Sequence, residues 1–187
     1  EKSIHYYSLA ADNNNHEAQK NLGDIYNDGK YFKIDYAKAF HYFQLAANQH
    51  FPPALNTLAF YYYYGKYVKQ DINKAIKYFQ EAADSNFDMA TFNLGYIFYE
   101  GKYIERNINK AIKFFNDAAK NGNVEAYNLL GDIYLEDRFV PKDIDLAIYY
   151  YSLSANKNNA KAQNNLGYIY LNIKKDIERA LYYYNLS

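Results

Sequence analysis

The sequence predicts an all-α fold in which helical hairpins stack into a solenoid. The first observation behind this prediction is a repeat of 36 residues. Its clearest markers are one alanine and one leucine that recur in register: Ala18, Ala54, Ala90, Ala126 and Ala162, then Leu22, Leu58, Leu94, Leu130 and Leu166. A period of roughly 20 to 50 residues is typical of repeat architectures. The second observation is that the apolar residues of each repeat fall in two blocks with helical spacing. The third is that turn and capping residues separate these blocks.

Each repeat is therefore predicted to contain a first and a second helix. The first helices are expected near residues 16–28, 52–64, 88–100, 124–136 and 160–171. The second helices are expected near residues 36–49, 72–85, 108–121 and 144–157, with further partial second helices near 2–13 and 177–186.

The residues between the helices suit helix ends. Glycines are predicted to close three first helices in the left-handed conformation: Gly29, Gly65 and Gly101. Side chains that accept hydrogen bonds are predicted to cap the second helices: Asp35, Asp71, Asn107, Asp143 and Asp176. The second helices end at residues that tolerate positive φ: Asn14, His50, Asn86, Gly122 and Asn158.

Two further features of the repeat concern packing and loop length. A small residue follows each repeated leucine and is expected where two helices approach closely: Gly23, Ala59, Gly95, Gly131 and Gly167. The distance from Ala147 to Ala180 is 33 residues instead of 36, and Asp137 replaces the glycine of the preceding turn. We call the loop between a first and a second helix a joint, and we therefore expect the last joint to differ in shape.

Composition limits the domain organisation and the function classes. The 187 residues are expected to form one solenoid domain: a partial repeat 1–15, repeats that start near 16, 52, 88 and 124, and a truncated repeat 160–187. Because the chain begins at Glu1 and ends within a helical pattern, we expect it to be a fragment of a longer protein.

The charge balance and the composition limit the function classes. The 21 basic residues balance the 21 acidic ones, which makes non-specific binding to nucleic acid a poor first hypothesis. No apolar run suggests a membrane span. The absence of cysteine leans toward a reducing compartment such as the cytoplasm.

The order of residues within one unit resembles the Sel-one-like repeat, a relative of the tetratricopeptide repeat. In the third unit the matching residues are Ala90, Leu94, Gly95, Phe98, Gly101, Asn107, Ala111, Phe114, Phe115, Ala118 and Ala119. The resemblance covers nearly the whole chain, with mild departures at Ala59, Asn107, Asp137 and Ser154. It implies a right-handed α-α superhelix, a tetratricopeptide-like solenoid that acts as a scaffold or adaptor for other proteins. From the residues themselves we expect neither enzymatic activity nor a cofactor.

In related solenoids the first helices line the concave side, and their solvent-facing positions provide the expected partner site. Exposed aromatic and methionine side chains are typical anchors of a protein partner. Carried over to this sequence, the predicted site for a peptide or helix is Phe60, Tyr63, Tyr64, Met89, Phe92, Tyr96, Tyr99 and Tyr168, with Asp24 and Asp132 attracting basic residues of the partner. The other interpretation is compositional, because a chain with 25 tyrosines uses tyrosine as its default large residue. One set of aromatics is assigned to packing by its spacing: Tyr26, Tyr62, Phe98, Tyr134 and Tyr170.

An alternative function is binding of single-stranded RNA or an acidic protein tail along one loop edge. Cations and aromatics alternate there: Lys30, Tyr31, Lys66, Tyr67, Lys102, Tyr103, Arg138 and Phe139. The interpretation that we favour is a solvated turn whose aromatic side chain folds back over the hairpin. Self-association through the exposed end helices is a further possibility.

Catalytic and metal-binding patterns are weak. The four histidines have neither the spacing of a metal site nor a nearby cysteine: His5, His16, His41 and His50. Ser154 and Lys157 match a Ser-x-x-Lys motif, but Ser154 stands at a packing position and the accompanying motifs are absent. We therefore expect no catalytic residues and no metal.

Overall fold

The computed structural model describes residues 2–187, and all regular structure within this range is helical. Glu1, the predicted start of the partial repeat, lies outside the described residues. The helices are α1 (Lys2–Asp12), α2 (His16–Asp28), α3 (Tyr36–Ala47), α4 (Pro52–Tyr64), α5 (Ile72–Asp84), α6 (Asp88–Glu100), α7 (Ile108–Lys120), α8 (Val124–Leu135), α9 (Ile144–Ala155), α10 (Ala160–Asn172) and α11 (Ile177–Leu186). The predicted all-α solenoid of hairpins is confirmed, and each predicted helix end lies within two residues of its observed end.

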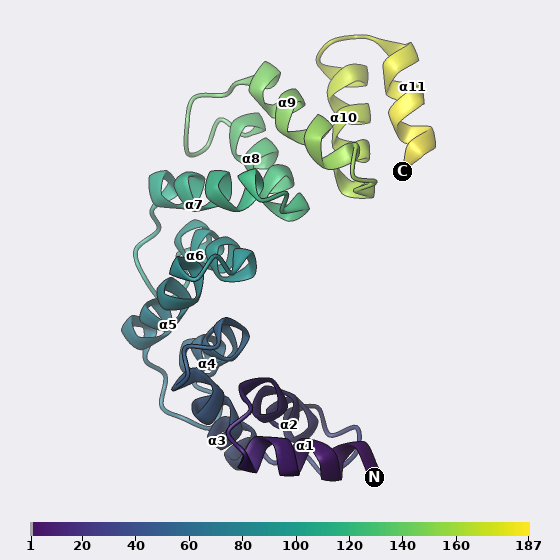
Figure 1. The fold of residues 1–187 in the computed structure, drawn as a ribbon. Helices are drawn as coiled ribbons and strands as arrows, with labels where there is room; N and C mark the ends of the chain where they lie inside the picture. The colour runs from purple at the N-terminus through teal and green to yellow at the C-terminus, as the bar shows by residue number, and fades with distance from the viewer. Residues whose placement is uncertain (1) are drawn as a thin grey trace. The chain divides into compact units, whose positions relative to one another are not determined.

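The helices follow one another as hairpins, in which a first helix packs on the second helix after it (Figure 1). The chain forms two compact units. The first contains residues up to Leu94 with Lys102–Ile104, and the second contains Gly95–Gly101 with Glu105–Ser187. In the first unit α2 packs on α3 and α4 packs on α5. In the second unit α8 packs on α9 and α10 packs on α11.

The repeated small residues allow these hairpins to close. A Cβ atom added to Gly131 would lie 2.6 Å from the ring of Tyr151, and one added to Gly167 would lie equally close to the ring of Tyr184. Real Cβ atoms do not approach other atoms so closely, so the aromatic ring of the second helix occupies the place of the missing side chain. Gly23 in the first unit and Gly95 in the second face Phe43 and Phe115 in the same way. The predicted close approach of helices at these glycines is confirmed.

The predicted helix ends are also confirmed. The side chain of each predicted cap accepts a hydrogen bond from the backbone N–H three residues later: Asp35, Asp71, Asn107, Asp143 and Asp176. The residues predicted for positive φ all adopt it: Gly29, Gly65 and Gly101, then Asn14, His50, Asn86, Gly122 and Asn158. Two residues adopt positive φ where the sequence did not predict it, Tyr67 at 66° and Lys175 at 57°.

One backbone hydrogen bond fixes every joint between a first and a second helix. The N–H of the capping residue donates to the carbonyl oxygen of the repeated aromatic. The five bonds measure 2.8 to 3.0 Å: Asp35 to Tyr26, Asp71 to Tyr62, Asn107 to Phe98, Asp143 to Tyr134 and Asp176 to Tyr170. The last loop keeps this bond although it is three residues shorter. Its predicted difference in shape is confirmed by Lys175, because the residue directly before the capping residue has a left-handed backbone in this joint and in none of the other four.

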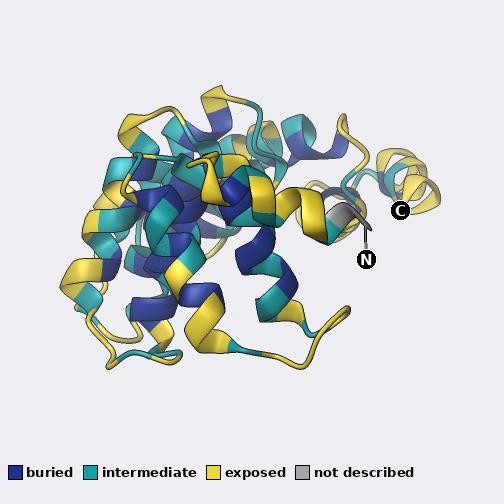
Figure 2. Ribbon diagram, turned by 60° about the horizontal axis from the view of Figure 1, so that its bottom comes forward, coloured by how far each residue is buried: buried dark blue, intermediate teal, exposed yellow. Residues whose placement is uncertain are grey.

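The core lies between the helices of each hairpin and between successive hairpins. Figure 2 shows buried residues along the inner faces of the helices and exposed residues in the loops and over most of α11. The fully buried large side chains of the first unit include Leu22, Phe43, Leu55, Leu58 and Phe79. Those of the second include Phe115, Leu130, Ile133, Tyr151, Leu166 and Ile169. The repeat therefore supplies a continuous series of equivalent packing positions.

Replacing a repeated leucine by alanine is expected to destabilise the protein strongly. Leu130→Ala should lower the free energy of unfolding by about 2 to 5 kcal/mol, because Leu130 is fully buried and its truncation leaves a cavity. Leu181→Ala, at an exposed leucine of α11, should change the same quantity by no more than about 0.5 kcal/mol. Urea unfolding followed by circular dichroism measures both. Equal effects of the two substitutions would contradict the assignment of the core.

Candidate functional site

The predicted partner site lies on the first helices, and in the first unit it includes two strongly exposed apolar side chains. Tyr64 near the end of α4 is 60% exposed, and Met89 at the start of α6 is 58% exposed. The ring of Phe60 stacks on that of Tyr64 at a centroid distance of 6.0 Å and contacts the buried ring of Phe79 at 5.0 Å. Phe92 is half-buried. Tyr64 and Met89 thus project from elements that are anchored in the core.

The predicted solvent-facing position of Tyr63 is wrong. Tyr63 is only 3% exposed, because its ring lies against Tyr64 at 5.0 Å and against Tyr103 at 5.1 Å. Tyr103 belongs to the loop after α6 and folds back onto α4. The positions carried over from related solenoids do not account for this loop aromatic. One member of the predicted partner site, Tyr63, is therefore part of the core.

In the second unit, two tyrosines at predicted site positions are exposed. These are Tyr96 in α6 and Tyr168 in α10, the latter 52% exposed. Tyr99 is half-buried, because its ring contacts Phe115 at 6.1 Å and Phe139 at 6.0 Å. Burial raises the pKa of the Tyr99 hydroxyl, and the negative charges of Glu136 and Asp132 raise it further. Tyr99 therefore packs against Phe115 and Phe139, whereas Tyr96 and Tyr168 are exposed to solvent.

The two acidic residues of the predicted site are already paired. Asp24 binds Lys20, one turn earlier on α2. Asp132 accepts hydrogen bonds from the Tyr151 hydroxyl at 2.7 Å, from Lys161 Nζ at 3.0 Å and from Asn165 Nδ2 at 3.3 Å. A basic residue of a partner would have to displace Lys161 to reach this carboxylate. The charges that the sequence suggested for partner binding thus serve contacts within the chain.

Burial of Tyr151 beside Asp132 has an electrostatic consequence. Desolvation raises the pKa of the Tyr151 hydroxyl, and the neighbouring Asp132 carboxylate raises it further. The hydroxyl therefore keeps its proton and donates a hydrogen bond to Asp132. Sequence reasoning missed Tyr151 and Asn165 as partners of this aspartate, because position 151 is a packing position in the repeat and three of its equivalents are phenylalanines, which have no hydroxyl: Phe43, Phe79 and Phe115.

Two buried asparagines at equivalent repeat positions differ in their bonding. Asn56 in the first unit accepts a hydrogen bond of 2.9 Å from Nδ2 of Asn93. Asn128 in the second unit is fully buried, and neither its amide oxygen nor its amide nitrogen has a hydrogen-bond partner among the described residues. Asn165, which follows Asn128 by the interval that separates Asn56 from Asn93, donates to Asp132 instead. The buried amide of Asn128 without hydrogen-bond partners is therefore a destabilising group.

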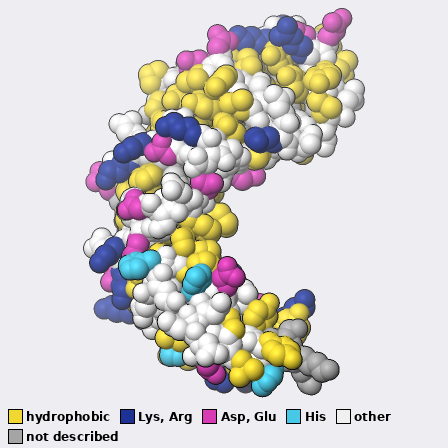
Figure 3. Space-filling view, in the orientation of Figure 1, with side chains coloured by type: hydrophobic (Ala, Val, Ile, Leu, Met, Phe, Trp, Pro, Cys, Tyr) yellow, Lys and Arg dark blue, Asp and Glu magenta, His cyan; other side chains and the backbone are white. Residues whose placement is uncertain are grey.

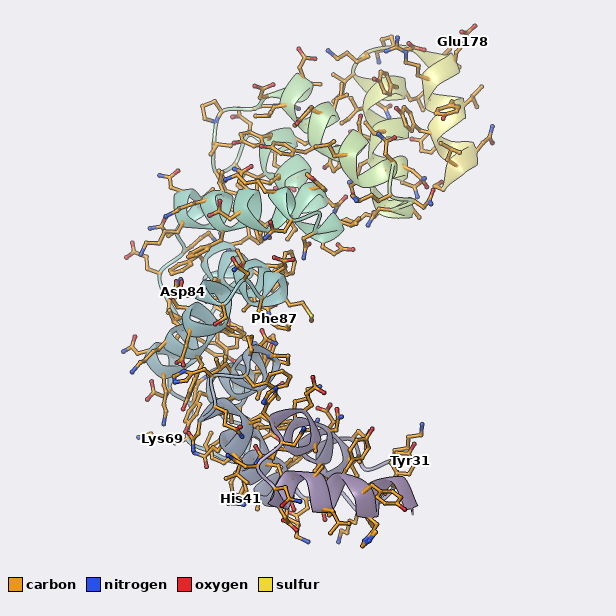
Figure 4. The ribbon with its side chains drawn as sticks, in the orientation of Figure 1. Tyr31, His41, Lys69, Asp84, Phe87 and Glu178 are labelled. Atoms are coloured by element: carbon orange, nitrogen blue, oxygen red, sulfur yellow. The ribbon has the colours of Figure 1, made fainter. Side chains whose placement is uncertain are left out.

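The cations of the loop edge lie over aromatic rings. Lys66 Nζ lies 4.1 Å from the centroid of Tyr36 and donates a hydrogen bond of 2.8 Å to Asn27. The other three lie over the aromatic that follows them in the sequence, at 4.8 to 5.3 Å: Lys30 over Tyr31, Lys102 over Tyr103 and Arg138 over Phe139. Three of the loop aromatics also pack back onto helices: Tyr67 on Phe40, Tyr103 on Tyr63 and Phe139 on Tyr99. This is the folded-back turn that we favoured from the sequence. Tyr31, labelled in Figure 4, projects from its loop into solvent.

The weak catalytic and metal motifs have structural roles. The Ser154 side chain is buried, and its hydroxyl donates a hydrogen bond of 3.1 Å to the carbonyl oxygen of Val124. His16 packs on the ring of Phe51, and His50 ends α3 with positive φ while it contacts Glu81. Within residues 2–187 no group of three or more His, Cys, Asp or Glu side chains is arranged to hold a metal ion. In the same range, the helices are too short and too polar to cross a membrane.

Comparison with known proteins supports the repeat assignment. The Sel1 repeat family model matches residues 1–15, 16–51, 52–87, 88–123, 124–159 and 160–187. No curated protein matches the chain. A Sel1 repeat protein from Oxalobacter formigenes is 29% identical with a TM-score of 0.86, over 99% of this chain and 77% of that chain. A protective antigen of uropathogenic Escherichia coli strains that displays an SLR fold is 29% identical with a TM-score of 0.87, over 98% of this chain but 40% of its own length. Cysteine-rich protein B of Helicobacter pylori is 31% identical with a TM-score of 0.53, over 69% of this chain and 92% of its own.

Replacing the unpaired asparagine by leucine is expected to stabilise the protein. Asn128→Leu should raise the free energy of unfolding by about 1 to 3 kcal/mol, because it removes a buried amide without hydrogen bonds. Asn56→Leu is the matched control. It should lower the same quantity, because it leaves Nδ2 of Asn93 without its acceptor. Urea unfolding of both variants measures these changes. A lower free energy of unfolding in Asn128→Leu would contradict the conclusion that the Asn128 amide is unpaired and destabilising.

The Tyr151 hydroxyl is expected to make stability depend on alkaline pH. Its pKa is raised by folding, so the folded state retains a proton that the unfolded state loses above about pH 10. The raised pKa therefore leaves the free energy of unfolding unchanged below about pH 10. Above that pH the free energy of unfolding falls by up to about 1.4 kcal/mol per pH unit. The stability advantage of the wild type over Tyr151→Phe should therefore shrink between pH 9 and 11 in urea unfolding. Tyr168→Phe, at an exposed hydroxyl, serves as the control, and an advantage that stays constant with pH would refute the assignment.

Proposed function

We propose, from the premise that the chain belongs to the Sel1 repeat family, that it is a scaffold that holds a peptide or helix of a partner protein on its first helices. Sel1 repeat solenoids generally serve protein–protein interaction and are typically not catalytic. The stacked helices within each unit offer surface rather than a deep cleft. A protein partner is therefore the class that this architecture suits best.

The observation that carries the proposal is the exposure of large apolar side chains at variable repeat positions. Tyr64 and Met89 in the first unit, and Tyr96 and Tyr168 in the second, are exposed although the helices that bear them are rigidly packed. Tyrosine and methionine provide large contact areas, and tyrosine loses little conformational entropy when it is fixed. Each unit thus contributes anchors on preformed helices.

The pairing of the acidic residues refines the proposed partner. Asp24 is bound to Lys20, and Asp132 is bound to Lys161, Tyr151 and Asn165. Apolar and aromatic side chains of the partner, rather than basic ones, then provide most of the binding free energy. We expect the affinity to depend only weakly on salt concentration, because screening acts on charges.

Binding along the loop edge is the weaker candidate. Its cations already lie over aromatic rings, so each would give up a contact in order to bind RNA or an acidic tail. Cytoplasmic location and self-association through the end helices stay predictions.

The proposed site can be tested with peptides selected on the protein itself. A random peptide library is displayed on phage and selected against the wild type, and the selected peptides are synthesised and titrated by fluorescence anisotropy. Two double variants cover the two units: Tyr64→Ser with Met89→Ser, and Tyr96→Ser with Tyr168→Ser. At least one should weaken binding by more than about 10-fold, as expected for the loss of anchor residues.

A matched double variant removes exposed tyrosines elsewhere. Tyr6→Ser with Tyr31→Ser takes away two strongly exposed rings that lie off the first-helix site. This variant should bind the peptides as the wild type does, and all variants should keep the helical circular dichroism and melting temperature. Equal affinity of all three double variants for every selected peptide would overturn the proposed site.

A further inference from the structure

The last joint of the chain lacks a side chain that earlier joints possess. Between the repeated aromatic and the capping residue, the fourth joint reads Leu-Glu-Asp-Arg-Phe-Val-Pro-Lys, whereas the last reads Leu-Asn-Ile-Lys-Lys. The missing three residues correspond to Asp137, Arg138 and Phe139, and in each of the first three units to Gly-Lys-Tyr. The backbone still closes through the bond from Asp176 to the Tyr170 carbonyl, at 2.8 Å. The deletion thus removes an aromatic side chain and keeps the helices in place.

The second joint, between α4 and α5, shows how that aromatic can pack. The ring of Tyr67 lies 5.6 Å from that of Phe40, and Phe40 also contacts Tyr62 at 5.9 Å. Tyr67 thereby covers Phe40, which is buried. The residues equivalent to Phe40 and Tyr62 at the last joint are Ile148 and Tyr170. No loop aromatic is present there to cover them.

A pocket of about 450 Å³ lies at this place in the second unit. Its wall is formed by Ile148 and Tyr149 of α9 and by Tyr170 of α10. Tyr149 is 56% exposed, so one face of its ring is open to solvent. Figure 3 shows hydrophobic side chains with Lys and Arg side chains beside them over the end of the chain that carries α10 and α11.

The charged groups around the pocket balance one another. Lys174 binds Asp145 at 2.7 Å, and Arg179 binds Asp176 at 3.3 Å. Two cations and two anions leave no net charge at the rim. The Arg179 guanidinium also lies 5.4 Å from the centroid of Tyr170 and holds that ring in place. The pocket consequently suits an uncharged ligand that has an apolar face.

We propose that this pocket binds an aromatic side chain, tyrosine or phenylalanine, presented by an extended segment of a partner protein. The partner's ring takes the position that Tyr67 takes over Phe40 at the second joint. The pocket is built from α9, the end of α10, the loop before α11 and the first turn of α11, and it shares no residue with the first-helix site. It adds a second contact to the proposed scaffold function, and its test is independent of that function.

The test uses the isolated side chain as the probe. N-acetyl-tyrosinamide and N-acetyl-phenylalaninamide are titrated to millimolar concentration into the isotope-labelled full chain, with N-acetyl-alaninamide as the control. The aromatic probes should shift the NMR signals of the Ile148 methyl group and of the Lys174 and Arg179 amides in a saturable manner. The alanine probe should leave them unchanged. Absence of saturable shifts at these residues would overturn the proposal.

Restoring the missing loop provides the sharpest control. Inserting Gly-Lys-Tyr between Asn172 and Ile173 returns the joint to 36-residue spacing and supplies an internal ring, so binding of the aromatic probes should weaken at least 10-fold. Inserting Gly-Lys-Ala restores the length without the ring and should leave binding within 3-fold of wild type. Equal binding by the two insertions would contradict the proposal.

A single substitution covers the case in which an insertion disturbs folding. Tyr149→Ala removes the exposed ring of the pocket wall and should weaken binding of the aromatic probes at least 5-fold, while the amide spectrum elsewhere stays that of the wild type. Binding that is unchanged in Tyr149→Ala would also overturn the proposal.

Discussion

Close contact between a glycine of the first helix and an aromatic ring of the following second helix is the constraint on which the hairpins depend, except in the hairpin of α4 and α5, where Ala59 stands at this position. Gly131 and Tyr151 show it clearly, since any side chain at position 131 would overlap the ring. Because the ring reaches into the first helix, the two helices keep one register and one separation. Equivalent contacts at Gly23, Gly95 and Gly167 give successive hairpins the same geometry. The leucine beside each small residue then faces the same kind of core in every repeat.

Once the hairpins are fixed in this way, the joints between helices can vary without disturbing the fold. The bond from the capping residue to the carbonyl of the repeated aromatic is retained when the loop loses three residues, as the Asp176 to Tyr170 contact demonstrates. Loop residues and solvent-facing residues are consequently free to differ from repeat to repeat. The proposed contacts with partners use this freedom: exposed side chains on the first helices, and a pocket left by a shortened loop.

Most of the fold could be predicted from the sequence, because its signals are local and occur several times. Gly29 and Asp35 mark helix ends by their chemistry, and Ala18 and Leu22 mark a core face by their spacing. The left-handed conformation of Lys175 could not be predicted, because it follows from the length of one loop and not from the residue type.

The candidate site was harder to predict than the fold, since exposure depends on contacts between repeats. Tyr63 and Tyr64 are neighbours with the same side chain, yet Tyr103 covers the first and leaves the second exposed. Asp132 appeared as a free charge in the sequence, whereas Tyr151 and Lys161 reach it from other helices. Neither arrangement has a signal in the 36-residue register. The register shows which positions build the solenoid, and the structure is needed to show which of the remaining positions are open to a partner.

The central claim is that positions fixed by the repeat determine folding, while positions that vary from repeat to repeat determine binding. A substitution scan of the whole chain, scored separately for protease resistance and for binding of a selected peptide, tests it most directly. The account predicts that substitutions at Gly131 or Leu130 reduce both scores, and that substitutions at Tyr64, Met89, Tyr96 or Tyr168 include those that reduce binding alone. The account would be contradicted if the positions that affect binding alone were confined to surfaces outside the first-helix site and the pocket of the last joint.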